Sequence, residues 1–216
     1  MKIVIAGAGE VGSHLAKLLS NEEQDILLID EDADRLAALD ASYNIMTMAG
    51  NPTSFLNLRN ALRDGCDIFI AVTPIEASNV VACSIAKTMG AGITVARISH
   101  YGYMAPENRE SMKRMGVDRV IYPEYLAAQE ILTALDHPWT RYWYEFHNGE
   151  IILAGVRLRS GAPLVGMQLK DFASSNHNFH VSAIKRDHES IIPRGDDRME
   201  EGDILYLSLI HISEPT

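Results

Sequence analysis

Short apolar runs alternate with segments of helical periodicity through residues 1–136. Runs that are apolar at nearly every position, rather than at every second one, suit strands buried on both faces. A regular strand–helix alternation is typical of a parallel sheet covered by helices. It predicts an α/β fold, a Rossmann-like parallel sheet with helices on both faces. The runs that we assign to strands are KIVIA, DILLI, IMTMA, DIFIAV, ITVARI and RVI.

Glycine and proline residues divide the helical segments where this fold requires it. Gly65, Gly90 and Gly116 each follow a helical segment, at a position where a left-handed residue ends a helix. Pro106 and Pro123 stand where a helix begins, because proline is tolerated in the first turn.

The character of the chain changes after residue 136, so we predict that the Rossmann-like domain spans 1–136. Pro138 and a cluster of aromatic residues follow, and we assign 137–144 to a linker. Short strands, Gly/Pro turns and one short helix around QLKDFAS then predict a small α+β module over 145–209. Residues 210–216 continue no pattern, and we leave them out of the fold as a truncated or non-native tail.

Composition excludes several classes of protein. The chain has 19 basic and 29 acidic residues and a net charge of -10, with no basic stripe, so we expect no nucleic-acid partner. Its longest apolar runs fall short of the ~18 residues that a membrane-spanning helix needs. Cys66 and Cys83 lack the CxxC spacing of a metal or redox site, so we predict two reduced, packed thiols.

The stretch GAGEVG places a G-x-G-x-x-G turn directly after the first strand and at the start of a helix. Gly7 permits the tight turn, Gly9 lets the backbone approach a pyrophosphate, and Gly12 lets helix and strand pack closely. Free N–H groups at the helix start attract phosphates. A βα turn without a ligand is the alternative. The other residues of this candidate cofactor site are Ala8, Glu10 and Val11.

Asp30 ends the second apolar run, at the position of the acidic partner of such a turn. A carboxylate there accepts the ribose hydroxyls of an adenosine and repels a 2′-phosphate, which favours NAD or an adenine nucleotide over NADP. Alternatively, Asp30 to Asp34 complement the dipole of the helix that follows. Both roles are compatible.

Further candidate ligand contacts lie where the other strands end, because open α/β sheets bind ligands there. They are Asn51, Thr73, Glu76, Asn79 and Arg97. Glu76 and Asn79 lie one helical turn apart and so share a face. Thr73 fits a helix N-cap as well as a ligand contact. Arg97 interrupts an apolar run and therefore requires a phosphate or a carboxylate as partner.

Catalytic motifs are missing from the sequence, which has no Tyr-x-x-x-Lys pair, P-loop, G-x-S-x-G elbow or H-E-x-x-H. We therefore expect no catalytic residue. His177 and His180 form an incomplete metal site, so we read them as solvated loop residues and predict no metal. His100, after the fifth strand, supports a catalytic role only weakly.

Two sets of motifs resemble one known family. GAGEVG, Asp30, GNPTS, DIFIAVTPIEASNVVACSIAK and ARIS are similar to the nucleotide-binding RCK (KTN) domain, and GAPLVGMQL with SAIKRDHESIIPRGDDRMEEGDILYL resembles its C-terminal companion. The resemblance runs from Met1 to about Leu209. It implies that the glycines face the phosphates of a ligand and Asp30 its ribose, with Asn51, Thr73, Glu76 and Arg97 around it.

The resemblance also implies a function. Such proteins are cytoplasmic regulatory subunits, peripheral at the inner face of the cell membrane, that bind NAD(H) or adenine nucleotides and control a Trk-type potassium-translocating membrane subunit. They form homo-oligomers, either dimers or rings, and perform no catalysis. Members of the Trk branch carry two such two-domain units, so this chain resembles an N-terminal half. A small NAD-dependent oxidoreductase is the alternative.

One residue departs from the pattern of the family members that hold ATP. They use an arginine where this chain has Glu10, and a carboxylate there disfavours a triphosphate. NAD(H) is therefore the expected cofactor, with ADP more compatible than ATP.

Overall fold

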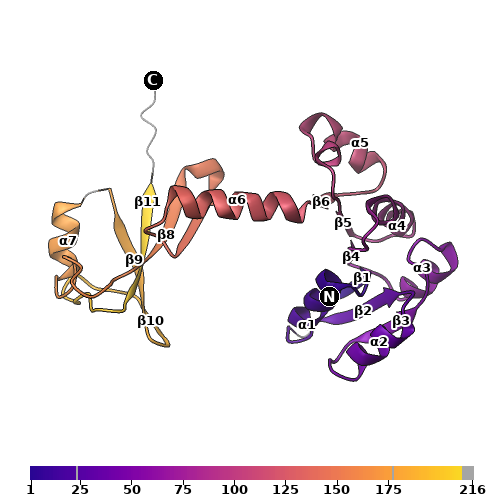
Figure 1. Ribbon diagram of the computed structural model, residues 1–216, viewed down its shortest axis with the longest axis horizontal. Coiled ribbons are helices and arrows are strands. Elements are labelled where there is room, and N and C mark those ends of the chain that lie inside the picture. The colour runs from indigo at the N-terminus through magenta and orange to yellow at the C-terminus, as the bar shows by residue number, and fades with distance from the viewer. Residues whose placement is uncertain (23, 177, 211–216) are drawn as a thin grey trace. The chain divides into compact units, whose positions relative to one another are not determined.

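The computed structural model describes residues 1–22, 24–176 and 178–210, which belong to two compact units, Met1–Ala127 and Ala128–Thr216 (Figure 1). The division falls inside helix α6 (Pro123–Asp136). The domain boundary expected after residue 136 corresponds to the end of that helix and stays a prediction.

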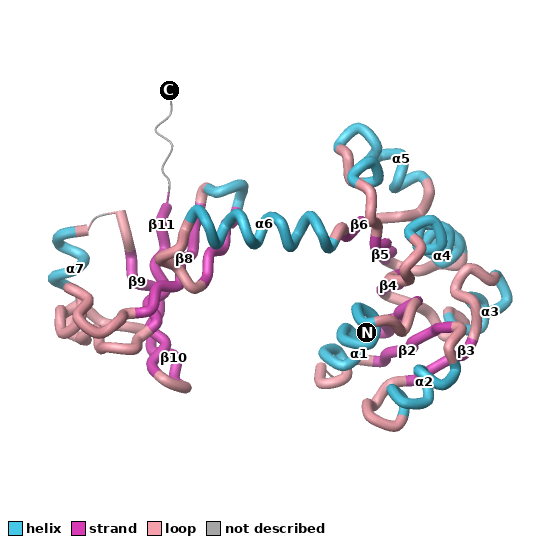
Figure 2. The backbone as a smooth tube through the Cα atoms, in the orientation of Figure 1, coloured by secondary structure: helices cyan, strands magenta, loops and turns pink. Residues whose placement is uncertain are grey.

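The first unit is a six-stranded parallel sheet of order β3-β2-β1-β4-β5-β6 (Figures 1 and 2). The strands are β1 (Lys2–Ala6), β2 (Asp25–Asp30), β3 (Met46–Ala49), β4 (Ile68–Ala71), β5 (Ile93–Arg97) and β6 (Arg119–Ile121). The helices between them are α1 (Glu10–Leu19), α2 (Ala33–Asp40), α3 (Phe55–Ala61), α4 (Glu76–Thr88) and α5 (Arg109–Arg114), with 3-10 turns at Tyr101–Tyr103 and Pro106–Asn108. The predicted Rossmann-like sheet is confirmed.

Helices cover both faces of this sheet, because successive side chains of a strand point to opposite sides. Val4 packs in one core cluster with Leu58 of α3 and Cys83 of α4. Its neighbour Ile3 packs in the other, with Leu36 of α2 and residues of α1. Burial on both faces explains why the strands read as continuously apolar runs.

The strand order places the ends of β1 and β4 side by side at the centre of the sheet. From β1, the strands β2 and β3 follow toward one edge of the sheet, and β4, β5 and β6 follow from the other side of β1 toward the opposite edge. In a sheet with this order, ligands bind outside the carboxyl ends of the strands at the point where the direction reverses. The glycine turn follows β1 and therefore lies at this point.

The turn residues behave as the sequence indicates. Gly65, Gly90 and Gly116 have φ of +88°, +96° and +81°, the left-handed region that ends a helix. Pro106 begins a 3-10 turn and Pro123 begins α6.

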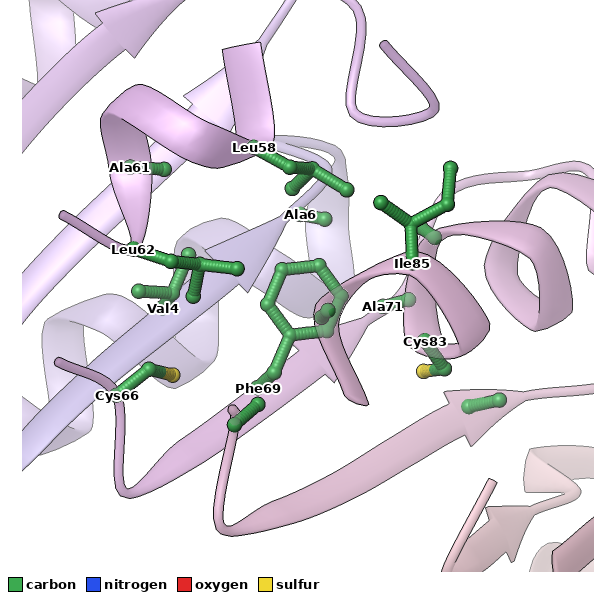
Figure 3. Packing of buried hydrophobic residues seen from close by; sticks show 14 of the residues in the cluster. Val4, Ala6, Leu58, Ala61, Leu62, Cys66, Phe69, Ala71, Cys83 and Ile85 are labelled. Carbon is green, nitrogen blue, oxygen red and sulfur yellow. The ribbon is translucent and has the colours of Figure 1, made fainter. Parts of the chain in front are cut away.

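The two cysteines are free and buried in the first core cluster, where Figure 3 shows them on either side of Phe69. Burial raises the pKa of Cys66 to about 11 and that of Cys83 to about 12. The prediction of packed, unbridged thiols is therefore confirmed.

The second unit is an antiparallel sheet of order β10-β9-β11-β8-β7. β7 begins at Tyr142, inside the segment predicted to be a linker, and β11 continues to Ile210, the first residue of the predicted tail. The rest of that tail, 211–216, lies outside the described residues. The elements are β7 (Tyr142–Phe146), β8 (Ile151–Arg157), α7 (Leu169–Ser175), β9 (His180–Arg186), β10 (Glu189–Ile191) and β11 (Ile204–Ile210), with a 3-10 turn at His147–Gly149.

The core of the second unit lies between the sheet and α7. Phe172 of α7 packs against Ile184 of β9 and Leu205 of β11, and Met199 is fully buried among them. Across residues 1–22, 24–176 and 178–210 of the chain, every helix is too short or too polar to cross a bilayer.

Candidate functional site

The glycine turn contains two glycines that the fold itself requires. Gly7 has a φ of +107°, and a Cβ there would lie 3.0 Å from the backbone nitrogen of Thr73. A Cβ on Gly12 would lie 1.8 Å from the carbonyl oxygen of Gly7, closer than any two such atoms can approach. These two glycines therefore let β1, α1 and the end of β4 pack together.

Gly9 differs from both, because the protein leaves its position open. Its φ is -67°, which any residue adopts, and a Cβ there would meet nothing within 4 Å. No described residue of the protein therefore requires a glycine at this place. The missing side chain leaves the backbone accessible to something outside the chain, as an approaching pyrophosphate requires.

The start of helix α1 offers backbone N–H groups to the same open space. Gly9 is the N-cap and has no side chain with which to cap the helix. The Ser13 N–H donates to the Gly9 carbonyl (2.9 Å), which begins the intrahelical ladder. The N–H groups of Glu10, Val11 and Gly12 precede that bond and have no intrahelical acceptor. Such groups, at the positive end of a helix dipole, attract an anion.

Asp30 lies at the end of β2 and holds the glycine turn in place. Its Oδ2 accepts a hydrogen bond from the Ala8 N–H (2.6 Å), and its Oδ1 accepts one from the Asp32 N–H (2.9 Å). A carboxylate has about four acceptor positions, so about two remain for the hydroxyls of a ribose. The N-cap of α2 is Asp32, whose side chain accepts from the Arg35 N–H, so Asp30 itself does not cap that helix.

Asn51 follows β3, the strand beside β2. Its Oδ1 accepts hydrogen bonds from the N–H and the hydroxyl of Thr53 (2.7 and 2.6 Å), which forms the turn that leads into α3. The Gly50 N–H donates to the Asp30 carbonyl (2.8 Å), so the ends of β2 and β3 are tied together. Asn51 is exposed and directly follows Gly50, the residue that is bonded to Asp30.

Thr73 and Asn79 bind each other at the end of β4. The Asn79 Oδ1 accepts from the N–H and the hydroxyl of Thr73 (2.9 and 2.7 Å), and its amide donates to the carbonyls of Thr73 and Arg97 (both 2.9 Å). Asn79 is 1% exposed. It therefore holds the ends of β4 and β5 together from behind the site. Thr73 is not the N-cap of α4, since that position belongs to Ile75.

Glu76, the first residue of α4, binds the loop that follows β5. Its carboxylate accepts from the N–H and hydroxyl of Ser99 (2.9 and 3.0 Å) and from the N–H of His100 (3.1 Å), and it contacts the His100 Nδ1. The Ser99 N–H bond, with the weaker effect of the Ser99 hydroxyl and His100, lowers the pKa of Glu76. Ser99 was missed by sequence reasoning, although the strand-end position of ARIS was a signal for it.

Arg97 ends β5 and is 28% exposed in its side chain. Its guanidinium lies 3.8 Å from the Glu124 carboxylate at the start of α6. The sequence predicts a phosphate or a carboxylate as the partner of Arg97, and the Glu124 carboxylate is the partner that the structure contains.

The structure thus brings the predicted residues to one edge of the sheet in two groups. One group contains the glycine turn, Asp30 and Asn51. In the other, Asn79 is hydrogen-bonded to Thr73 and to the Arg97 carbonyl. Glu76 belongs to this second group through the loop after β5, where it binds Ser99 and His100. In the described part of the chain, no three His, Cys, Asp or Glu residues gather as a metal site. His180 is exposed at the start of β9, and His177 lies outside the described residues.

Comparison with known proteins gives consistent results for both units. Residues 3–123 match the TrkA-N domain family and residues 153–209 match the TrkA-C domain family. The chain is 35% and 32% identical, each over 209 residues, to the Trk system potassium uptake proteins TrkA of Halomonas elongata and Haemophilus influenzae. These alignments cover 95% and 94% of this chain but 46% and 45% of those proteins, so the chain spans less than half their length.

A solved structure, the GsuK channel bound to NAD, shares the fold. Its TM-score is 0.63 at 15% sequence identity, over 97% of this chain and 37% of that one.

Proposed function

This chain belongs to the TrkA-N domain family, and from that premise we propose that it is a regulatory subunit of a Trk-type potassium transporter. In this proposal it binds NAD(H) or an adenine nucleotide at the glycine turn and catalyses no reaction. The observation that carries the proposal is the open position of Gly9, beside an uncapped helix start and a carboxylate with unused acceptor positions.

The residues of the site divide the work of binding as follows. The backbone of Gly7 to Gly12, with Ala8, Glu10 and Val11, holds the pyrophosphate, and Asp30 accepts the ribose hydroxyls. Asn51, exposed beside Asp30, borders the adenosine. Thr73, Glu76, Asn79 and Arg97 form the other wall. Asn79 is buried and internally bonded, so it positions Thr73 and Arg97 rather than touching the ligand.

The choice of nucleotide follows from two carboxylates. Asp30 repels a 2′-phosphate, which disfavours NADP. Glu10 is exposed at the first position of α1, directly at the phosphate end of the site, and disfavours a triphosphate. We therefore expect NAD(H) to bind better than ADP, and ADP better than ATP.

Control of transport requires ligands that act differently on two states of the protein. A ligand shifts such an equilibrium only by the difference in its affinity for the two states. NADH and a competing nucleotide would occupy the same turn yet favour different arrangements. Helix α6 is the covalent route between the two units and hence the route of the signal.

We propose further that the subunit is cytoplasmic, attached at the inner face of the membrane through its potassium-translocating partner, and that it forms a dimer or a ring. Support for self-association comes from α6, which buries none of its residues. Its apolar side chains, with Leu126, Ile131 and Leu135 more than half exposed, favour burial against another subunit.

Calorimetric titration of the purified chain with NADH, NAD, ADP and ATP tests the binding site. We expect NADH binding in the wild-type chain and a loss of about tenfold or more in Gly9→Ala and Asp30→Ala. Asp25→Ala is the matched control, because Asp25 is an exposed carboxylate at the opposite end of the same strand. Equal binding by all of these variants would contradict the proposed site.

Absorbance at the nicotinamide band separates regulation from catalysis. Bound NADH should stay unchanged, whereas an oxidoreductase would oxidise it in proportion to a substrate. Co-purification with a Trk-type membrane subunit tests the partner. We expect the wild-type chain and Gly9→Ala to co-purify equally without nucleotide, and to differ only when nucleotide is added.

A further inference from the structure

We propose that the second unit contains a separate anion site, in which Arg141, Arg157 and Arg159 bind a phosphate group of a small ligand. The three arginines line a pocket of about 450 Å³. The other residues that line it are Pro138, Trp139 and Thr140. All six lie within Ala128–Thr216, so the pocket belongs to one unit and does not depend on the glycine turn.

Strand geometry brings two of the arginines together. Arg157 is the last residue of β8, and Arg159 follows two positions later. Leu158 between them is 4% exposed, and its N–H donates to the Asp203 carbonyl (2.8 Å). In extended backbone, neighbouring side chains point to opposite sides, so the two arginines that flank a buried leucine face outward together.

The third arginine comes from the other side of a strand pair. β7 runs antiparallel to β8, with Tyr142 opposite Gly155. Just before β7, the Arg141 N–H donates to the Gly155 carbonyl (2.7 Å), which fixes this segment beside the end of β8. The pocket is therefore framed by backbone hydrogen bonds on both sides.

The charge of these arginines meets no carboxylate among the described residues, although the Arg141 guanidinium lies over the Tyr142 ring, 5.7 Å from its centroid. Among the described residues, none of the three forms an ion pair or a side-chain hydrogen bond, and no carboxylate lines the pocket. In a chain with 29 acidic residues, this separation from carboxylates is notable. Arg186 shows the contrast, since it binds the carboxylates of both Glu200 and Asp203.

The chemistry of the pocket favours a phosphate over other anions. Guanidinium groups bind phosphate oxygens in pairs of parallel hydrogen bonds, and three of them together match a multiply charged anion. Trp139, half exposed and edge-on to His137 and Trp143, offers a flat apolar wall for the organic part of the ligand. The volume lies in the range of small-molecule sites.

The test uses the full chain and inorganic pyrophosphate as the probe, followed by calorimetry. In Gly9→Ala, which weakens the glycine turn as a competing site without the backbone clash of Gly12→Ala, pyrophosphate should still bind. In Arg157→Ala and Arg159→Ala, affinity should fall about tenfold or more, because a charge-assisted pair is lost. Arg157→Lys should recover only part of it, since lysine keeps the charge without the fork. Arg194→Ala, an exposed arginine of the same unit, is the charge-matched control.

The results separate this proposal from the nucleotide site. Unchanged NADH binding by Arg157→Ala, together with weakened pyrophosphate binding, would support two independent sites. Pyrophosphate that binds equally to wild-type, Arg157→Ala and Arg194→Ala chains, or to none of them, would overturn the proposal.

Vesicles identify the source of the phosphate. Sedimentation with phosphatidylcholine vesicles that contain phosphatidylglycerol, if lost in Arg157→Ala but not in Arg194→Ala, would support a lipid headgroup in this pocket. Pyrophosphate binding without sedimentation would support a soluble phosphate ester. Sedimentation that is equal in both variants, without pyrophosphate binding, would overturn the proposal.

Discussion

The glycine turn of the first unit and the arginine pocket of the second use different parts of the chain. The turn offers backbone N–H groups, and its geometry depends on glycines. The pocket offers side-chain guanidinium groups on an antiparallel sheet. In the parallel sheet, all carboxyl ends meet at one edge, so topology alone gathers polar groups there. In an antiparallel sheet, strand ends alternate between edges and no such edge exists.

The carboxylates of the two units show the same contrast. Asp30 accepts two hydrogen bonds from the backbone of the protein, and its other acceptor positions remain open at the edge of the sheet. Asp203 is buried and accepts from the Arg186 guanidinium at both oxygens (2.8 and 2.9 Å) and from the Glu200 N–H (2.8 Å). Burial favours the neutral form of Asp203, but the bonds from Arg186 and Glu200 outweigh it and lower its pKa. Asp30 therefore has acceptor positions left for a ligand, whereas the hydrogen bonds of Asp203 stabilise the second unit itself.

Each unit carries its own probe of unfolding, so the comparison is testable. Both tryptophans, Trp139 and Trp143, belong to the second unit, and both cysteines, Cys66 and Cys83, belong to the first. Because burial raises both thiol pKa values, thiol reagents at neutral pH should react only when the first unit opens. Tryptophan fluorescence reports the second unit independently.

The largest expected effect is that of Gly12→Ala on the first unit. The added Cβ meets backbone at 1.8 Å, which only a shift of α1 relieves, so we expect the free energy of unfolding to fall by about 3 kcal/mol. Alanine favours helix over glycine by about 1 kcal/mol, so the loss cannot come from propensity. Thiol reactivity in urea should rise earlier, while the tryptophan transition should stay unchanged.

Gly9→Ala is the matched variant in the same turn. Its Cβ enters open space at an ordinary φ, so stability should change by less than about 0.5 kcal/mol. Similar destabilisation by the two substitutions would contradict the division between a glycine required by the fold and one required by a ligand.

Asp203→Asn should produce the corresponding effect in the second unit. It removes the paired bonds to Arg186, and since the Arg186 side chain is 32% exposed, water compensates part of the loss. We expect the tryptophan-detected transition to lose about 2 kcal/mol. Glu201→Gln, at an exposed position nearby, should leave it unchanged. A simultaneous shift of the thiol transition would show that the units do not unfold separately.

Acid should weaken the second unit partly through the same carboxylate. A lowered folded pKa means that the unfolded chain binds the proton more readily, so this stability is complete above the ordinary pKa of 3.8 and is lost as pH falls through the lower folded value. The tryptophan transition of the wild-type chain should therefore decline below about pH 4. In Asp203→Asn the decline should be smaller, with Asp196, paired to Lys170, as a remaining source. Parallel pH curves for the two chains would contradict this assignment.

The sequence predicts the first unit well because its signals are local. Continuously apolar runs fit only strands covered on both sides, and Gly7, Gly12 and Asp30 follow directly from the strand ends. The glycine pattern alone could not distinguish Gly9 from Gly7 and Gly12, because the open space at Gly9 depends on which residues the fold brings near each glycine.

The remaining roles depend on partners that are distant in the chain. Asn79 binds the carbonyl of Arg97, and no local pattern predicts that pairing. The spacing of Arg157 and Arg159 is visible in VRLRS, but only the β7–β8 pairing brings Arg141 to them. The second sheet is antiparallel, so its site could not be located by a rule about strand ends.

The smallest expected effect is that of Glu76→Gln, and it tests whether this residue belongs to the scaffold or to the ligand site. An amide can keep only part of the four contacts that the carboxylate makes with Ser99 and His100. We therefore expect a small drop in the urea midpoint of the thiol transition and a NADH affinity within about threefold of the wild type. Because the pKa of Glu76 is lowered, the difference in midpoint should vanish as acid protonates the wild-type carboxyl. Loss of NADH affinity at unchanged stability would instead identify Glu76 as a direct ligand contact. Glu76 would then resemble Asp30, which has acceptor positions left for a ligand.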